Sequence, residues 1–145
     1  MYKRQILKNL VDEKLAGEIR FYEIIPDEEE LLIHQLIRFC TNDRVDLVLT
    51  TGGTGVSPRD ITPDATLKVI DKEIPGFGEI MRTESLKKTF NAVLSRATAG
   101  VKNSTLIINL PGSPKAVKEC FEAIYKAINH AIEKIKGDTS DCYEG

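Results

Sequence analysis

The chain has 145 residues, which is close to the ~150 residues expected of a single domain. Apolar residues make up 41% and charged residues 29%, a composition that supports one hydrophobic core and excludes wholesale disorder. The 20 basic and 22 acidic residues give a net charge of −2, so we expect no nucleic-acid partner. No apolar run reaches the ~18 residues that span a bilayer, and the start lacks a signal-peptide pattern, so we expect a cytoplasmic protein without a membrane partner.

Helix and strand patterns alternate in the first third of the chain. Helical spacing of apolar residues predicts a helix over 6–15, and the β-branched and aromatic run at 19–25 predicts a strand. Asp27, with a glutamate three residues later, predicts a capping box that starts a helix over 27–40. The short apolar run at 45–50 predicts the next strand.

The remaining elements follow the same alternation. A threonine N-cap and a following proline predict a helix over 62–73, and after a Pro-Gly break at 75–78 a further helix is predicted over 78–88. The apolar run at 105–110 predicts a buried strand, and a long amphipathic pattern predicts a helix over 114–137. This order predicts a parallel-sheet α/β domain.

The three cysteines, Cys40, Cys120 and Cys142, are too widely spaced for a disulfide framework or a CxxC site. Cys40 and Cys120 fall on apolar faces of predicted helices, which predicts buried thiols. Neither His34 nor His130 has a partner at ligand spacing, so no zinc site is predicted. Chemistry in this chain is therefore expected from carboxylates and backbone groups.

Ligands of such sheets bind beyond the carboxyl ends of the strands, which selects the loops at 51–60 and 111–114. The first loop holds Gly52, Gly53 and Gly55, whose freedom of backbone conformation lets N–H groups converge on an anion. The loop matches neither a Walker loop nor GxGxxG. A purely structural glycine turn is the alternative.

Carboxylates follow two predicted strands of the same sheet. Asp27 and Asp60 are expected to meet above its carboxyl edge, where they could hold Mg²⁺ or align a phosphoryl group. The alternatives are a helix N-cap for Asp27 and a turn residue paired with Arg59 for Asp60. Asp64, just inside the next helix, is more typical of a favourable charge at a helix N-terminus than of a ligand.

The second loop leads directly into the long helix, whose N-terminus is a potential anion site with Lys115 close by. Ser113 is either part of that site or the helix cap, and Asn109 either bonds a ligand or makes a structural amide pair. The small polar residues at 95–100 are candidates to line the same cleft. From the residues alone, the chain is a phosphate-handling α/β domain.

Several motifs occur in a fixed order: Pro-Asp-Glu at 26–28, Thr-Thr-Gly-Gly-Thr-Gly at 50–55, Arg-Asp-Ile-Thr-Pro-Asp at 59–64, Pro-Gly-Phe-Gly at 75–78, Leu-Ser-Arg at 94–96 and Asn-Leu-Pro-Gly-Ser-Pro-Lys at 109–115. In these motifs the chain resembles the molybdopterin adenylyltransferases of molybdenum cofactor synthesis, together with the related MoaB proteins and the N-terminal domain of gephyrin. The resemblance covers about residues 6–137. It implies a three-layer α/β sandwich with a mostly parallel sheet flanked by helices.

The resemblance also implies an activity: transfer of AMP from ATP to the terminal phosphate of molybdopterin, with Mg²⁺ and release of pyrophosphate. By this resemblance, Asp27 and Asp60 correspond to the family's two essential aspartates, and they are the implied Mg²⁺ ligands. A homotrimer, or a hexamer, and a downstream molybdenum insertase are the implied partners. Substrate and nucleotide contacts are implied for Thr51, Gly52, Gly53, Thr54, Gly55, Ser57, Arg59, Asp64, Ser95, Asn109, Pro111, Gly112, Ser113 and Lys115.

One departure from the family pattern concerns the start of the chain. The family opens with an apolar strand ending in Ser-Asp and an acidic, glycine-containing loop, and neither precedes the first predicted helix. We therefore expect an N-terminally truncated single domain over 1–137 with reduced stability or activity, and a flexible tail over 138–145. Two other functions stay open: a nucleotide pyrophosphatase of the type found with CinA and FAD synthase, and a non-catalytic molybdopterin-binding module.

Overall fold

The computed structural model describes residues 2–137, so the predicted tail and Cys142 lie outside the described residues. The helices are α1 (Tyr2–Leu10, continued by a π-helical turn over Val11–Leu15), α2 (Glu29–Thr41), α3 (Thr62–Val69), α4 (Pro75–Leu86) and α5 (Pro114–Ile135), with a 3-10 turn over Phe90–Leu94. The strands are β1 (Leu47–Thr51), β2 (Lys72–Glu73), β3 (Ala99–Lys102) and β4 (Thr105–Leu110). Within residues 2–137 we find no helix with the length and apolar character needed to cross a bilayer.

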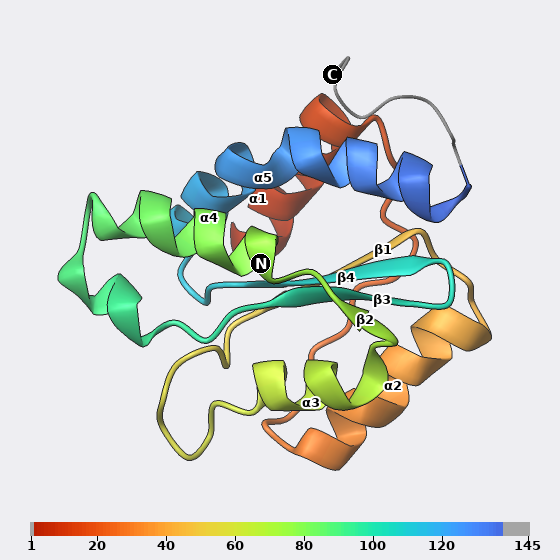
Figure 1. Ribbon diagram of the computed structural model, residues 1–145, viewed down its shortest axis with the longest axis horizontal. Helices are drawn as coiled ribbons and strands as arrows, with labels where there is room; N and C mark the ends of the chain where they lie inside the picture. The colour runs from red at the N-terminus through yellow and green to blue at the C-terminus, as the bar shows by residue number, and fades with distance from the viewer. Residues whose placement is uncertain (1, 138–145) are drawn as a thin grey trace.

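The strands form one sheet in the order β1-β4-β3-β2, with α1, α4 and α5 over one face and α2 and α3 over the other (Figure 1). This confirms the predicted α/β sandwich of three layers. The sheet itself is mixed, because β1 and β4 are parallel whereas β3 pairs antiparallel with both β4 and β2. The difference from a mostly parallel sheet arises at Asn103, whose positive φ of 54° turns β3 tightly back into β4.

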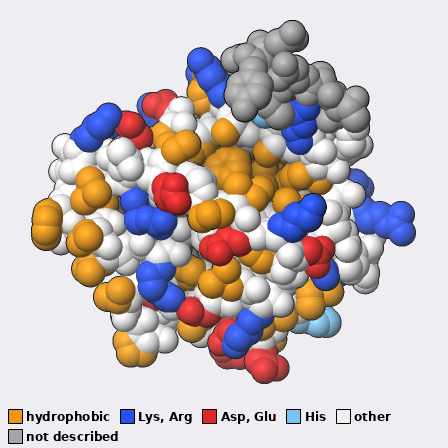
Figure 2. Space-filling view, viewed as in Figure 1, with side chains coloured by type: hydrophobic (Ala, Val, Ile, Leu, Met, Phe, Trp, Pro, Cys, Tyr) orange, Lys and Arg blue, Asp and Glu red, His pale blue; other side chains and the backbone are white. Residues whose placement is uncertain are grey.

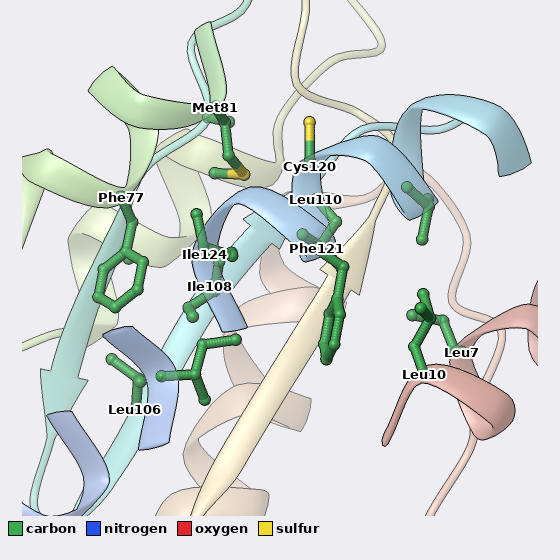
Figure 3. Close-up of a cluster of buried hydrophobic side chains, with 14 residues drawn as sticks. Leu7, Leu10, Phe77, Met81, Leu106, Ile108, Leu110, Cys120, Phe121 and Ile124 are labelled. Carbon is green, nitrogen blue, oxygen red and sulfur yellow. The ribbon is translucent and has the colours of Figure 1, made fainter. Parts of the chain in front are cut away.

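The core lies on both faces of β4, all six residues of which are buried. Leu106, Ile108 and Leu110 belong to a cluster shared with α1, α4 and α5, where Phe121 is fully buried (Figure 3). Ile107 points the other way, into a second cluster made with α2 and α3. Because successive side chains of a strand face opposite sides, one apolar run anchors both helical layers to the sheet.

The predicted buried thiols are confirmed for the two cysteines within the described residues. Cys40 belongs to the α2–α3 cluster, and Cys120 lies on the inner side of α5. Burial raises the pKa of both thiols, since removal from water disfavours the thiolate.

The strand predicted over 19–25 is wrong, because residues 16–27 form neither helix nor strand apart from one bend. A strand needs a neighbour with which to exchange backbone hydrogen bonds. The described neighbour on that side is β1, but β1 pairs only with β4. A groove of about 1140 Å³ separates the two segments and is lined by both. The β-forming residues of 19–25 therefore remain unpaired along the rim of this groove.

Three predicted helix boundaries are also corrected. The capping box at Asp27 does not form, since α2 starts from Glu28 without a side-chain cap. The helix predicted over 62–73 ends at Val69, because residues 72 and 73 pair with β3. The helix predicted over 78–88 begins three residues earlier, because Pro75 occupies the first turn of α4, where the missing N–H costs nothing.

Candidate phosphate-binding site at the carboxyl edge of the sheet

The two loops selected by the strand-end rule lie against each other. Thr51 and Leu110 are register partners, so β1 and β4 end at the same level. The Gly52 N–H donates to the Leu110 carbonyl at 3.0 Å, and a Cβ on Gly112 would lie only 3.4 Å from the Gly52 Cα. The backbones of the loops over 52–61 and 111–113 therefore form one continuous surface at this edge.

The glycines of the first loop are required by its shape. Gly52 and Gly53 have positive φ angles of 88° and 68°, a region that L side chains rarely adopt. A Cβ on Gly53 would also collide with the Thr62 hydroxyl, and the Thr62 N–H donates to the Gly53 carbonyl at 3.1 Å. The loop thus folds back onto the first residue of α3, which brings the positive end of that helix to the edge.

Asp60 is held inside this loop. One oxygen of its carboxylate, Oδ2, accepts hydrogen bonds from both the backbone N–H and the hydroxyl of Ser57 at 3.0 Å. The same oxygen would lie 2.8 Å from a Cβ on Gly55, so only glycine lets the carboxylate approach so closely. The carboxylate therefore has a fixed position beside the glycine backbone.

Asp27 reaches the same loop through Arg59. The Arg59 Nη2 donates to the Asp27 Oδ2 at 2.9 Å, which joins the segment before α2 to the loop after β1. The pair is exposed, with 83% of the Arg59 side chain open to solvent. Asp27 was predicted to lie near Asp60, and the structure shows Asp27 in contact with Arg59, the residue that precedes Asp60.

Arg96 connects the loop to the segment that precedes β3. Its Nε donates to the Gly55 carbonyl at 2.7 Å and its Nη2 donates to the Asp60 carbonyl at 2.6 Å. Both terminal nitrogens also donate to the Asp64 carboxylate at 3.0–3.1 Å. These bonds hold the pKa of Asp64 below its ordinary value, against the opposing effect of partial desolvation, which raises it.

The second loop contributes a capped helix N-terminus. The Ser113 hydroxyl accepts from the Ala116 N–H at 3.2 Å, which confirms the capping interpretation of this residue. Lys115 lies exposed in the first turn of α5. Its ammonium group can therefore move toward an anion bound at either loop.

Asn109 lies beneath the loops and is fully buried. Its amide donates to the hydroxyls of Thr50 and Thr66 at 3.0 Å, and its carbonyl accepts from the Thr98 N–H at 3.2 Å. Both polar atoms of the side chain are thus bound by protein groups. The structure favours a structural amide pair over a ligand contact.

The carboxylates of Asp27 and Asp60 fit a magnesium ion only if substrate phosphates supply further ligands. Among residues 2–137, no group of three or more His, Cys, Asp or Glu side chains is arranged to hold a metal ion. Asp60 uses one oxygen for Ser57, and Asp27 is paired with a cation. Mg²⁺ is commonly held by one or two carboxylates together with substrate phosphates and water, and this donor set meets that need.

The sequence predicted the two loops but not the contacts that Arg96 makes with Gly55, Asp60 and Asp64. Of the predicted residues, Asp27, Arg59, Asp60, Asp64 and the glycines all take part in contacts at the edge. Arg96 appeared in the Leu-Ser-Arg motif and within residues 95–100, the candidates to line the cleft. Its contact with Asp64 was not predictable, because 32 residues separate the two and no local spacing links them. An arginine followed by a run of small residues that leads into β3 is the weak signal available.

The chain matches a family model described as "Probable molybdopterin binding domain" over residues 3–130. It is 49% identical over 133 residues to the "Molybdopterin adenylyltransferase" of Helicobacter pylori strain J99, which covers 91% of this chain and 76% of the relative. It is 46% identical over 109 residues to the protein of the same name from Escherichia coli K12, covering 75% of this chain and 56% of the relative.

Solved structures agree with these sequence matches. The "Molybdopterin biosynthesis enzyme MoaB" from Thermus thermophilus superposes with a TM-score of 0.86 at 40% identity, over 94% of this chain and 85% of that one. The "Molybdopterin biosynthesis Mog protein" from Mycobacterium ulcerans gives 0.80 at 32% identity, over 93% and 87%. The chain therefore belongs to the molybdopterin-binding family of molybdenum cofactor biosynthesis, with the MogA and MoaB proteins.

Proposed function

We propose that this chain is a molybdopterin adenylyltransferase acting in molybdenum cofactor biosynthesis. An oxygen of the terminal phosphate of molybdopterin attacks the α-phosphorus of ATP and forms a new P–O bond. The bond from the α-phosphorus to the bridging oxygen breaks, and pyrophosphate leaves. Family membership and the names of two relatives at 49% identity support this activity.

The observation that carries the proposal is the surface formed by the two loops. Both reactants are anions, so the reaction needs charge neutralisation and in-line positioning more than covalent help from the protein. The loops after β1 and β4 touch at Gly52 and Gly112 and lead into the N-termini of α3 and α5. Two helix N-termini at one edge offer backbone N–H groups and positive dipole ends to phosphates.

Charged side chains complete the proposed site. Arg59 and Lys115 supply positive charge on exposed side chains beside the loops, where a triphosphate can reach them. Asp60, fixed by Ser57, and Asp27 are the proposed Mg²⁺ ligands. When bound with ATP, Mg²⁺ would neutralise negative charge on the phosphates and orient them. We propose Mg-ATP and molybdopterin as the substrates.

The test is an assay for AMP transfer on the purified protein. Molybdopterin and Mg-ATP are supplied, and adenylylated molybdopterin and pyrophosphate are quantified by mass spectrometry. We expect both products in equal amounts from the parent. Asp60→Asn keeps the shape of the side chain but removes its charge, and we expect adenylylation to fall by at least ~10²-fold, as when one positioned electrostatic group is lost.

Asp12→Asn is the matched control, because Asp12 is an exposed aspartate in the π-helical turn after α1, where it pairs with Lys8. It should retain the parent rate. An Asp60→Asn protein within a few-fold of the parent would remove Asp60 from the mechanism. Hydrolysis of ADP-type substrates without AMP transfer would instead support the pyrophosphatase alternative, and molybdopterin binding without ATP turnover would support a binding module.

We further propose a homotrimer, or a hexamer built from it, in the cytoplasm, with a molybdenum insertase receiving the product. An exposed apolar surface supports self-association: Leu86, Phe90, Val93 and Leu94, at the end of α4 and in the 3-10 turn, are 45–82% exposed (Figure 2, left). Light scattering at micromolar concentration should give the mass of a trimer or hexamer. A monomer would contradict the proposed assembly.

A further inference from the structure

We propose that Arg96 is the positioning residue of the phosphate-binding loop, and that Asp64 acts as the anchor of Arg96 and not as a substrate contact. Arg96 fixes residues 55–60 in one conformation and so sets where the Asp60 carboxylate stands. The inference rests on the proposed adenylyltransferase function for its kinetic consequence, but its structural part can be tested without that function.

The guanidinium group of Arg96 reaches three separate points. It binds the Gly55 carbonyl at 2.7 Å, the Asp60 carbonyl at 2.6 Å and the Asp64 carboxylate at 3.0–3.1 Å. The first two points mark the beginning and the end of the exposed segment 56–59. One rigid plane therefore fixes the distance between the two ends of the segment, which a flexible single-point donor cannot do.

This clamp acts directly on Asp60. The backbone carbonyl of Asp60 is held by Arg96, its N–H donates to the Ser57 carbonyl at 2.9 Å, and its carboxylate is held by Ser57. Release of the carbonyl leaves Asp60 tied only to Ser57, which lies within the same exposed segment. The segment and the carboxylate would then move together.

Arg96 is itself well fixed, which makes it suitable as a clamp. Its own N–H donates to the Thr54 carbonyl at 2.8 Å. On the other side, Arg82 donates from Nη1 to the Ala97 carbonyl at 2.8 Å and to the Ser95 carbonyl at 3.4 Å. Gly78 makes room for Arg82, because a Cβ on Gly78 would lie 3.0 Å from both terminal nitrogens of the Arg82 side chain. The backbone that carries Arg96 is thus held on both sides.

The charge of Asp64 is already used by this clamp. Its carboxylate receives three hydrogen bonds from the two terminal nitrogens of Arg96, and the side chain is 44% exposed. A negative charge at this point would repel phosphates if it were free. Neutralised by Arg96, it orients the guanidinium toward the loop carbonyls.

The experiment compares Arg96→Lys with Arg38→Lys in the full chain. Arg38 is the matched control, because its side chain is also 38% exposed and ion-paired, but its partners are Glu23 and Asp43, away from the loop. Lysine keeps the charge and loses the planar fork. The readouts are kcat, KM for each substrate, the thermal midpoint, and the rate of tryptic cleavage after Arg59, which lies in the clamped segment.

For Arg96→Lys we expect kcat to fall by up to ~10²-fold, because small displacements of a catalytic group cost this much, while KM for molybdopterin stays within about two-fold. Cleavage after Arg59 should accelerate by at least ~10-fold, since lost charge-assisted hydrogen bonds raise the open population of the loop. Arg38→Lys should match the parent in every readout.

Asp64→Asn is the second variant. We expect it to lower kcat and accelerate cleavage in the same direction as Arg96→Lys, with both KM values unchanged. A raised KM for ATP or molybdopterin with an unchanged kcat would show that Asp64 touches substrate and would overturn its role as an anchor.

Two results would overturn the role of Arg96: parent values of kcat and cleavage in Arg96→Lys, or a loss of activity that follows a general loss of folded protein with cleavage throughout the chain. If the parent itself transfers no AMP, the proposed function fails. In that case the cleavage rates of the variants still decide whether Arg96 clamps the loop.

Discussion

The Arg59 side chain donates a hydrogen bond to the Asp27 carboxylate, although 32 residues separate the two in the sequence. This ion pair links the segment before α2 to the glycine loop. Both side chains are exposed, 83% and 48%, so solvent screens their attraction. A bound triphosphate would compete for Arg59 and a bound cation would compete for Asp27. In the proposed site, the pair would therefore neutralise the charges of Arg59 and Asp27 until the substrates arrive.

The first prediction separates activity from stability at this pair. Asp27→Asn should lower AMP transfer by at least ~10-fold, because a proposed Mg²⁺ ligand is lost. The thermal midpoint should change by less than about 4 °C, since exposed ion pairs contribute only ~0–1 kcal/mol. Differential scanning calorimetry and the AMP-transfer assay measure the two effects. A large loss of stability with normal activity in the folded protein would make Asp27 a structural residue.

The second prediction concerns the buried amide of Asn109. Asn109→Leu leaves the Thr98 N–H without its side-chain acceptor and removes the donor to Thr50 and Thr66. We expect a loss of ~2–4 kcal/mol in the free energy of unfolding, because unpaired buried polar groups cost ~1–3 kcal/mol each. Urea denaturation measures this loss. Unchanged stability with a raised KM for molybdopterin would instead make Asn109 a substrate contact.

Local sequence patterns correctly predicted the elements whose burial follows from their own apolar residues. The run at 105–110, with four apolar residues among six, coincides with β4, which is buried on both faces, and the long amphipathic pattern coincides with α5. The strand-end rule then brought the two loops together, because parallel β1 and β4 end in register.

Elements that depend on distant partners were not predictable. Residues 19–25 have the composition of a strand but no described neighbour to pair with. Residues 72 and 73 continue a helical pattern yet pair with β3, some 28 residues further on. Arg96 reaches Asp64 only after the chain has folded, so no local spacing records the contact.

The third prediction uses the loop glycines. Gly53→Ala puts a side chain on a residue with φ of 68° and against the Thr62 hydroxyl, so we expect a loss of at least ~1–2 kcal/mol in stability together with reduced AMP transfer. Gly76→Ala is the control, because a Cβ there meets nothing within 4 Å and lies in the first turn of α4. It should be neutral or stabilise by up to ~1 kcal/mol. Equal effects of both changes on the chemical denaturation midpoint would contradict the proposed loop geometry.

The fourth prediction follows from the lowered pKa of Asp64. Because Arg96 favours the ionised carboxylate in the folded state, its contribution to stability is present above the ordinary pKa of 3.8 and is lost as the pH falls through the lower folded value. The side chain is 44% exposed, so we expect less than about 1 kcal/mol. The difference in unfolding free energy between the parent and Asp64→Asn should thus be present at pH 7 and shrink below pH 3.8. A difference that stays constant down to pH 2 would contradict this pair.

The last prediction concerns the second edge of β1. Among the described strands β1 pairs only with β4, and its other edge faces the groove of about 1140 Å³. Apolar side chains line the groove from both helical layers: Leu7, Val11 and Leu15 from one, Leu32, Leu36 and Phe39 from the other. This is the environment of a strand buried on both faces, so an apolar strand added beside β1 should pair with its free backbone groups.

An apolar strand of about six residues, fused ahead of residue 2 through a flexible linker, should raise the thermal midpoint, since each new hydrogen bond adds ~0.5–1.5 kcal/mol and each buried side chain ~1.5–3 kcal/mol. Amide hydrogen exchange should slow at Leu47, Leu49 and Thr51, whose backbone groups face the groove because the intervening residues bond β4. A fusion of equal length made of serine and lysine is the control, because polar side chains cannot fill an apolar groove. If both fusions leave the midpoint and the exchange rates of β1 unchanged, the groove does not accept a strand.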